Sequence, residues 1–421
     1  MIEIVRPEKE KAILVAVKTR DKKRSEIEEH LNELQLLADT AGAETIIKII
    51  QERSSYDSAF FIGKGKAQEI AELAQLNEIN LIVFDEDLTP TQVRNLENII
   101  NKKIIDRSGL ILDIFASHAK TKLAKTQVEL AQLQYMLPRL TRAWTHLSKQ
   151  YGGIGTKGPG ETQIETDRRI IRSRIASLKL SLEKMDAQDL IKSTKRKNFL
   201  NVSLVGYTNA GKSTLMNLLT AANVLAEDKL FATLDSTTRS LELEKNKLII
   251  LSDTVGFIRK LPKNLFASFK STLNVVRSAD LILHVVDLSA NTFEEHIEVV
   301  SQTLKELNCE NKKSILVFNK VDAVNDSAKL QYAVNKYKDS ILISATKGMN
   351  ISQLKDNLIN IYEENFREET FELRLDESKK DALIHDLADV LEQKYIDDKI
   401  VLKIKTDTIN LKKVKSMINE K

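Results

Sequence analysis

A glycine-rich run that ends in a lysine and a serine is the first feature that could carry out chemistry. Residues Gly206-Tyr207-Thr208-Asn209-Ala210-Gly211-Lys212-Ser213 fit the phosphate-loop pattern G-x-x-x-x-G-K-[ST]. Glycines let consecutive backbone N–H groups face a phosphate, and the helix that follows adds its positive end. We expect Lys212 to contact the β- and γ-phosphates and the Ser213 hydroxyl to bind a magnesium ion that keeps most of its waters. The run therefore predicts a nucleotide site.

A second motif that could act on phosphate lies about forty residues further on. Asp253-Thr254-Val255-Gly256 follows the apolar strand expected over residues 248–251 and has the D-x-x-G arrangement. In that arrangement the aspartate holds magnesium through water and the glycine amide meets the γ-phosphate. Many GTPases place a glutamine after this glycine to orient the attacking water, but this chain has Phe257. We therefore expect slow hydrolysis until a partner, or ordering of the switches, accelerates it.

Two further motifs predict recognition of the base. Asn319-Lys320-Val321-Asp322 follows a buried strand expected over residues 314–318. The Asp322 carboxylate can accept hydrogens from both N1 and N2 of guanine, a pair that adenine does not offer. Ser344-Ala345-Thr346, after an expected strand over 341–343, would close over the base with backbone amides. Four motifs in this order predict GTP and GDP as the nucleotides.

The threonine that binds magnesium when γ-phosphate is present is expected within residues 231–239. This segment offers Thr233, Thr237 and Thr238. It resembles the F-x-T-L segment of translation GTPases, and that resemblance favours Thr233 together with its neighbours Phe231, Ala232, Leu234 and Asp235. The predicted catalytic residues are thus Lys212, Thr233 and Gly256, and the predicted magnesium ligands are Ser213 and Thr233.

The elements around the phosphate loop have the required order. Residues 199–205 are predicted to form a short apolar strand, and residues 214–219 have helical spacing. At 421 residues the chain is long enough for two to four domains. We expect a cytoplasmic protein without stable membrane insertion, because no run of eighteen apolar residues and no signal-peptide core is found. The single Cys309 excludes a disulfide framework, and the six histidines lack the spacing of a zinc site.

The first hundred residues alternate strand and helix patterns. Their non-alternating apolar strands predict a parallel sheet covered on both faces. Strands are expected over 13–17, 45–50, 81–84 and 103–106, and helices over 25–41, 66–76 and 90–100. Gly63-Lys64-Gly65-Lys66 could cradle a second phosphate, although a plain strand-to-helix turn is the favoured interpretation.

A basic helical hairpin is expected next. Two heptad stripes, starting near Leu123 and Ile164, flank a run with five glycines in nine residues, 152–160. Pro138 should kink the first helix. Residues 116–197 contain 17 Lys and Arg against 7 Asp and Glu, a charge of +10 in a chain of net charge +4. A basic tip suits phosphate-rich RNA, and the cations expected there are Arg139, Arg142, Lys149, Lys157, Arg168, Arg169, Arg172 and Arg174.

The predicted fold is a multidomain α/β chain. Its expected parts are an N-terminal parallel α/β subdomain (1–115), an antiparallel helical hairpin (116–190), a linker (191–197), a central phosphate-loop G domain (198–365) and a small C-terminal α+β domain (366–421). For the last part we expect a strand over 371–375, a helix over 379–394, a strand over 400–405 and a helix over 411–418.

The chain resembles the HflX family of bacterial and organellar GTPases over nearly its whole length. The resemblance lies in 128–133, 137–140, 206–215, 230–235 and 253–258, and above all in the segment from Gly152 to Gln163 with Glu165–Arg169. It implies a cytoplasmic GTPase that binds the large (50S) ribosomal subunit near its catalytic centre through ribosomal RNA, with roles in protein synthesis, ribosome splitting or rescue under stress, or ribosome biogenesis.

The sequence therefore predicts a monomeric nucleotide switch that uses Mg²⁺ and GTP, binds the large ribosomal subunit and does not bind DNA. The alternative is an RNA-binding or remodelling protein in which the N-terminal half does the work and the GTPase is only a regulator. RNA or ribosome binding by residues 1–197 alone, regardless of nucleotide, would favour that alternative.

Overall fold

The computed structural model of the chain describes residues 9–140, 163–194, 199–220, 230–231, 236–244, 247–261, 273–364, 367–375, 377–396, 399–406 and 408–419. By their contacts the residues form two compact units. The first contains Met1–Asp189, Ala226–Asp235 and Val255–Asn274, and the second contains Leu190–Leu225, Ser236–Thr254 and Val275–Lys421. No helix in the described part of the chain is long and apolar enough to cross a membrane.

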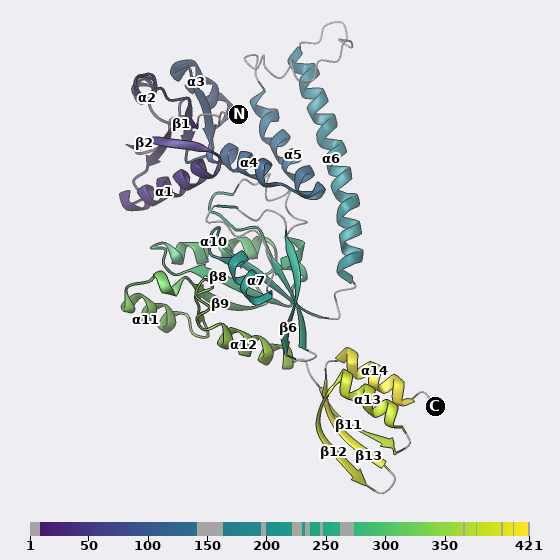
Figure 1. Cartoon of the computed structure of the whole chain (residues 1–421). Coiled ribbons are helices and arrows are strands. Elements are labelled where there is room, and N and C mark those ends of the chain that lie inside the picture. Colours follow the sequence, from purple (N-terminus) through teal and green to yellow (C-terminus); the bar gives the residue numbers. More distant parts are fainter. Residues whose placement is uncertain are drawn as a thin grey trace, which may run out of the picture. The chain divides into compact units, whose positions relative to one another are not determined.

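The first unit begins with the predicted parallel sheet, in the order β2-β1-β3-β4. Figure 1 shows α1 on one side of this sheet and α2 and α3 on the other, so both faces are covered as expected. Thr89 and Pro90 start α3, since the Thr89 hydroxyl accepts from the backbone N–H of Gln92. The elements are β1 (Glu10–Lys18), α1 (Arg24–Thr40), β2 (Ala43–Glu52), α2 (Lys64–Leu76), β3 (Leu81–Phe84), α3 (Pro90–Ile100), β4 (Lys103–Asp106) and α4 (Arg107–His118).

The last helix of this group, α4, was not predicted. It starts directly at the end of β4, where the Asp106 carboxylate caps it by accepting from the Gly109 backbone N–H at 2.8 Å. Eight of its twelve residues are buried, including Arg107. A helix buried on most of its surface lacks the amphipathic period by which helices are recognised in a sequence.

The helical hairpin consists of α5 (Lys122–Met136), the 3-10 turn η1 (Leu137–Arg139) and α6 (Gln163–Thr194). Leu130 on α5 packs against Leu178 and Leu182 on α6, so the two stripes meet as predicted. Figure 1 shows the two helices side by side. Helix α5 ends at Met136, and Pro138 lies in the 3-10 turn that follows, whereas the sequence predicted a kink within a continuing helix. The predicted glycine loop, 152–160, lies outside the described residues.

One of the cations predicted for the hairpin tip has a structural role instead. The Arg139 guanidinium is 16% exposed and donates to Asp106 Oδ2 and to the Leu88 carbonyl, both at 2.9 Å. It also lies over the Tyr135 ring, 3.6 Å from the centroid. Arg139 therefore ties the hairpin to the edge of the sheet and is not available for RNA.

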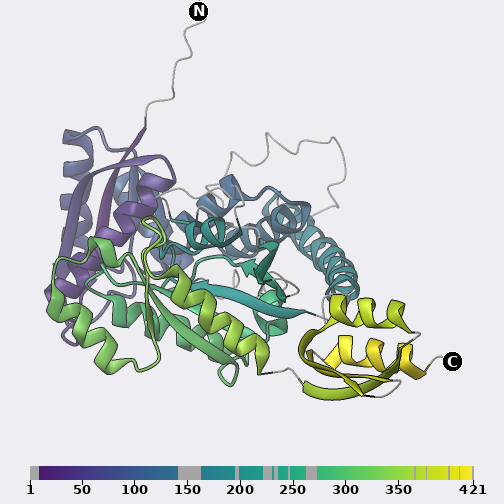
Figure 2. The same ribbon diagram turned by 60° about the horizontal axis from the view of Figure 1, so that its bottom comes forward.

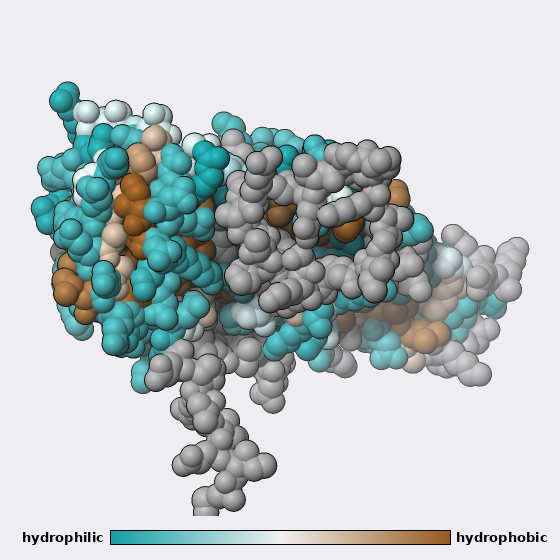
Figure 3. Space-filling model, turned by 90° about the horizontal axis from the view of Figure 1, so that it is seen from above, coloured by the Kyte–Doolittle hydropathy of each residue, from teal (hydrophilic) through white to brown (hydrophobic). Residues whose placement is uncertain are grey.

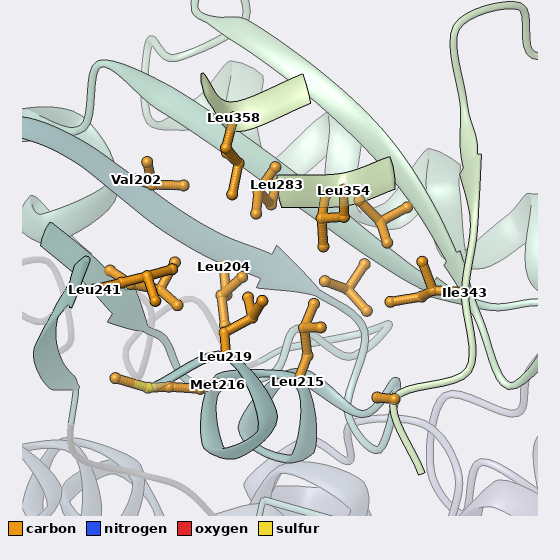
Figure 4. Close-up of a cluster of buried hydrophobic side chains, with 14 of the residues drawn as sticks. Val202, Leu204, Leu215, Met216, Leu219, Leu241, Leu283, Ile343, Leu354 and Leu358 are labelled. Atoms are coloured by element: carbon orange, nitrogen blue, oxygen red, sulfur yellow. The ribbon is translucent and has the colours of Figure 1, made fainter. Parts of the chain in front are cut away.

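The second unit contains a six-stranded sheet in the order β10-β9-β8-β5-β7-β6, in which only the β6–β7 pair is antiparallel. Its core is the cluster of Figure 4, where Leu215 and Leu219 of α7 lie beside Leu204 of β5. The elements are β5 (Leu200–Gly206), α7 (Lys212–Thr220), β6 (Thr237–Glu244), β7 (Lys247–Asp253), α9 (Asn274–Ser278), β8 (Leu281–Asp287), α10 (Phe293–Glu306), β9 (Lys313–Asn319), η3 (Val321–Ala323), α11 (Ser327–Lys336), β10 (Ile341–Leu342) and α12 (Ile351–Glu363).

The C-terminal part differs from its prediction by one strand. It contains β11 (Arg367–Arg374), α13 (Ser378–Leu387), β12 (Asp389–Ile396), β13 (Lys399–Thr406) and α14 (Thr408–Asn419), with the strands in the order β11-β13-β12. The helix predicted to reach residue 394 ends at Leu387, and the following residues pair with β13. Figures 1 and 2 show α13 and α14 on the same side of this antiparallel sheet.

In the view of Figure 3 hydrophilic residues cover most of the described surface, and hydrophobic residues show at the left and again at the lower right. Apolar side chains are gathered instead in separate cores, one for each sheet. Each sheet thus has the buried apolar layer that a folded domain needs.

The core under the phosphate loop gives a stability prediction. Leu204 is fully buried on β5, so Leu204→Ala should lower the free energy of unfolding by about 2–5 kcal/mol. Leu218→Ala is the matched control, because that leucine on α7 is 42% exposed and its removal should change stability by no more than about 0.5 kcal/mol. Urea unfolding followed by circular dichroism measures both, and equal effects would contradict this description of the core.

Candidate nucleotide-binding site

The phosphate-loop residues lie at the carboxyl end of β5, the strand hydrogen-bonded between β7 and β8. Gly206 ends β5 and Lys212 begins α7, so the strand, loop and helix occur in the predicted order. A Cβ on Gly206 would lie 2.1 Å from the Val285 carbonyl oxygen of β8. Only glycine therefore allows the two strands to stay at their observed spacing as the loop begins.

Two residues of the loop between β5 and α7 have positive φ. Asn209 has φ of 58° and Gly211 has φ of 90°. A Cβ on Gly211 would lie 2.2 Å from the Asn319 side-chain nitrogen. Turns of this kind can direct successive backbone N–H groups to one side, as an anion site requires.

Lys212 lies over the loop. Its side chain is buried, and Nζ donates to the Tyr207 carbonyl at 2.8 Å and the Gly206 carbonyl at 3.1 Å. Burial lowers the pKa of Lys212 to about 8, although the nearby Asp253 charge acts in the opposite direction. A bound phosphate would supply the countercharge that a buried ammonium group favours.

Two oxygens beside the loop have the chemistry of a magnesium site. The Ser213 hydroxyl donates to Asp253 Oδ2 at 2.6 Å, and Asp253 Oδ1 is buried without a hydrogen-bond partner among the described residues. Burial raises the pKa of Asp253, while Lys212 lowers it. A hydroxyl and a carboxylate with an unsatisfied oxygen fit a hard divalent cation and its waters.

Asn319 joins the phosphate loop to the predicted base loop. Its Nδ2 donates to the Ala210 carbonyl and its Oδ1 accepts from the Ala345 backbone N–H, both at 2.9 Å. Asn319 is buried. Since one amide group makes both bonds, the two loops are held at a fixed separation from each other.

The other residues predicted for the base site either follow Asn319 directly or belong to the loop that contains Ala345. Lys320 has φ of 61°, and its ammonium group lies 2.8 Å from Asp287 Oδ2 at the end of β8. Asp322 follows on η3 and is exposed. Ser344 is buried, and its hydroxyl accepts from the Lys347 backbone N–H at 3.1 Å.

The predicted switch residues are not all described. Ala232, Thr233, Leu234 and Asp235 lie outside the described residues, while Phe231 is buried and packs edge-on against Phe115 of α4, with 4.6 Å between centroids. Asp253 and Thr254 belong to the second unit, and the Thr254 hydroxyl donates to the Leu204 carbonyl at 2.7 Å. Val255 and Gly256 belong to the first unit. The division between the units therefore falls inside the D-x-x-G motif.

One contact of the phosphate loop was missed by the sequence analysis. The Tyr207 ring stacks on the His296 ring of α10, with 3.8 Å between centroids and 10° between planes. Tyr207 is buried. A loop aromatic residue and a helix histidine that are distant in the sequence give no pattern from which the stack could be found.

Known protein families match the chain in three consecutive segments. The matching family models are described as GTP-binding GTPase N-terminal (residues 28–116), GTP-binding GTPase middle region (118–196) and 50S ribosome-binding GTPase (201–320). They include strands β2 to β4 of the N-terminal sheet, the hairpin and most of the phosphate-loop sheet, whereas β1 lies before the first matched residue.

Individual relatives match between 75% and 93% of the chain. A protein named GTPase HflX from Lacrimispora saccharolytica is 44% identical over 93% of this chain and 92% of its own. GTPase HflX of Flavobacterium psychrophilum is 51% identical over 75% of this chain and 76% of its own. GTPase HflX of Escherichia coli is 44% identical over 82% of this chain and 81% of its own. Together with the phosphate-loop sheet, these matches show that the chain is a GTP-binding GTPase that belongs to the HflX family.

Proposed function

We propose that GTP binds at the carboxyl edge of the β5 sheet with its phosphates in the Gly206–Ser213 loop, and that the chain acts with the large ribosomal subunit. The contacts of Lys212, Ser213 and Asp253 support the first part, because they bring together an ammonium group, a hydroxyl and a carboxylate. Lys212 would contact the β- and γ-phosphates. Ser213 and Thr233 would bind Mg²⁺, and Asp253 would hold it through water. Bound Mg²⁺ neutralises charge that develops on the phosphates.

The base lies, in this proposal, against Asp322 and the loop of Ser344, Ala345 and Thr346. The Asn319 bridge supports this arrangement, since it fixes the base loop relative to the phosphate loop through the Ala345 N–H. The exposed Asp322 carboxylate can then accept from guanine N1 and N2. Guanine specificity would follow from one side chain.

Asp322→Asn tests this role. An amide presents a donor to guanine N1–H, so the GTP affinity should fall by at least about tenfold, and the variant should gain preference for xanthosine triphosphate. Asp339→Asn is the control, because Asp339 is also exposed but lies outside the four motifs. Equilibrium titration with both nucleotides measures the preference. An unchanged preference for GTP would contradict the proposal that Asp322 recognises the base.

The partner is proposed from the charge of the hairpin. Five cations of α6 are exposed, Arg169, Arg172, Arg174, Lys179 and Lys184, and the Arg174 side chain also pairs with Glu129 at 2.7 Å. Helix α6, which carries these cations, is held in place by the packing of Leu178 and Leu182 against Leu130 of α5. A row of exposed cations suits the phosphates of ribosomal RNA. The description of the central family model as a 50S ribosome-binding GTPase supports the same partner.

We further propose that hydrolysis by the chain alone is slow. The side chain after Gly256 is Phe257, which is buried, so it offers no polar group to orient the attacking water. A partner that completes or orders the site would raise the rate. Ribosome splitting, rescue and biogenesis are all compatible with such a partner-activated GTPase.

GTP turnover with and without large ribosomal subunits, at one fixed salt concentration, tests the partner. Large subunits should raise the turnover of the wild type by at least about tenfold. Arg169→Glu with Arg172→Glu should lose most of this stimulation and keep the basal rate, because repulsion replaces phosphate contacts. The control is Lys412→Glu with Lys413→Glu on α14, which has the same charge change. An unstimulated wild type would contradict the proposed partner.

A further inference from the structure

A stacked pair of rings links the phosphate loop to helix α10. The Tyr207 and His296 rings lie 3.8 Å apart between centroids and 10° from parallel, and Tyr207 is only 4% exposed. The motifs that predict the nucleotide site do not include His296. The phosphate-loop pattern therefore leaves the purpose of this contact unexplained.

The Tyr207 backbone is a point at which the loop is held together from within. Its carbonyl accepts from Lys212 Nζ at 2.8 Å and from the Ala210 backbone N–H at 3.3 Å. Gly206, the residue before it, is the last residue of β5. A rotation of the peptide that carries this carbonyl would therefore displace both the turn of the loop and the ammonium group that is expected at the phosphates.

The two halves of the loop have separate supports. Asn319 holds the second half, because its amide donates to the Ala210 carbonyl at 2.9 Å. The stack on His296 restrains the Tyr207 side chain in the first half. Asn209 lies between the two supports and has φ of 58°, which non-glycine residues seldom adopt. Such a conformation persists where the surrounding contacts determine it.

His296 is itself held in place by the start of α10. Phe293 is buried and packs edge-on against Phe318 of β9, with 5.9 Å between centroids. Glu294 is tied to α11, since its carboxylate accepts from Lys336 Nζ at 2.5 Å. All of these residues belong to the same compact unit as the phosphate loop. The His296 ring is therefore a fixed surface against which the loop can pack.

We propose that His296 is a positioning residue for nucleotide binding and acts through the Tyr207 ring. The stack holds the first half of the phosphate loop in the arrangement that receives the α- and β-phosphates. The inference rests on the proposed place of the phosphates in the Gly206–Ser213 loop. Without the stack the loop occupies other arrangements for part of the time, and the measured dissociation constant rises as the binding-competent fraction falls.

The effect is the same for GDP and GTP, because both nucleotides place α- and β-phosphates in the loop. It leaves the hydrolysis rate of bound GTP unchanged, since a support that is equal in the ground state and the transition state alters binding alone. A residue that acts at the γ-phosphate would change that rate. These two properties distinguish the role of His296 from that of a catalytic residue.

A double-mutant cycle on the full chain tests the inference, with His296→Ala, Tyr207→Leu and the two changes combined. Each single change removes the stack, so each should raise the dissociation constants of GDP and of a non-hydrolysable GTP analogue by about three- to tenfold. The combined variant has no further stack to lose. It should therefore bind within about twofold of the weaker single variant.

Two more variants show whether the ring itself is responsible. His296→Phe should restore binding to within about twofold of the wild type, because a phenyl ring can also stack on Tyr207. Gln302→Ala is the matched control, since Gln302 is exposed on the same helix, and it should leave binding unchanged. The single-turnover hydrolysis rate of bound GTP should stay within about twofold of the wild type when His296 is replaced. Far-ultraviolet circular dichroism checks that each variant is folded.

GDP binding by His296→Ala as tight as that of the wild type would overturn the inference. Full addition of the two single losses in the combined variant would also overturn it, as would equal losses in His296→Phe and His296→Ala. Lys212→Ala separates this result from the proposed phosphate site. If Lys212→Ala bound GDP like the wild type, the placement of the phosphates would be wrong; if Lys212→Ala lost GDP binding and His296→Ala did not, only the role of His296 would fail.

Discussion

The buried amide of Asn319 is the interaction on which the nucleotide site depends. It donates to Ala210 in the phosphate loop, 109 residues away in sequence, and accepts from Ala345, 26 residues away. Asparagine is suited to this position because a short side chain must both donate and accept. Its place also explains Gly211, since any Cβ there would collide with the amide nitrogen. One side chain at the end of β9 thus sets the geometry of two loops.

The D-x-x-G motif spans the division between the two compact units. Thr254 is tied to β5 by its hydroxyl, whereas the residues from Val255 onward belong with the first unit. The peptide bond between Thr254 and Val255 therefore joins the two units within a motif that is predicted to contact the γ-phosphate.

Much of this organisation could be predicted from local sequence. Pro90 and the capping Thr89 define the start of α3, and the strand-loop-helix order around Gly206 follows from short-range patterns. β12 was missed because its apolar residues continue the helical spacing of α13, and only pairing with β13 makes it a strand. Arg139 was predicted to be exposed, because its partner Asp106 is distant in sequence. The pairing of Lys260 with Asp85 likewise depends on tertiary structure, since single charges in a loop carry no periodicity.

The GDP affinity of Asn319→Ala tests the central account most directly. Removing the amide breaks two buried hydrogen bonds and leaves the Ala345 N–H and the Ala210 carbonyl without their partner. Isothermal titration should show GDP binding at least about tenfold weaker than in the wild type, with the far-ultraviolet circular dichroism unchanged. A folded variant that binds GDP as tightly as the wild type would contradict the claim that this side chain holds the site together.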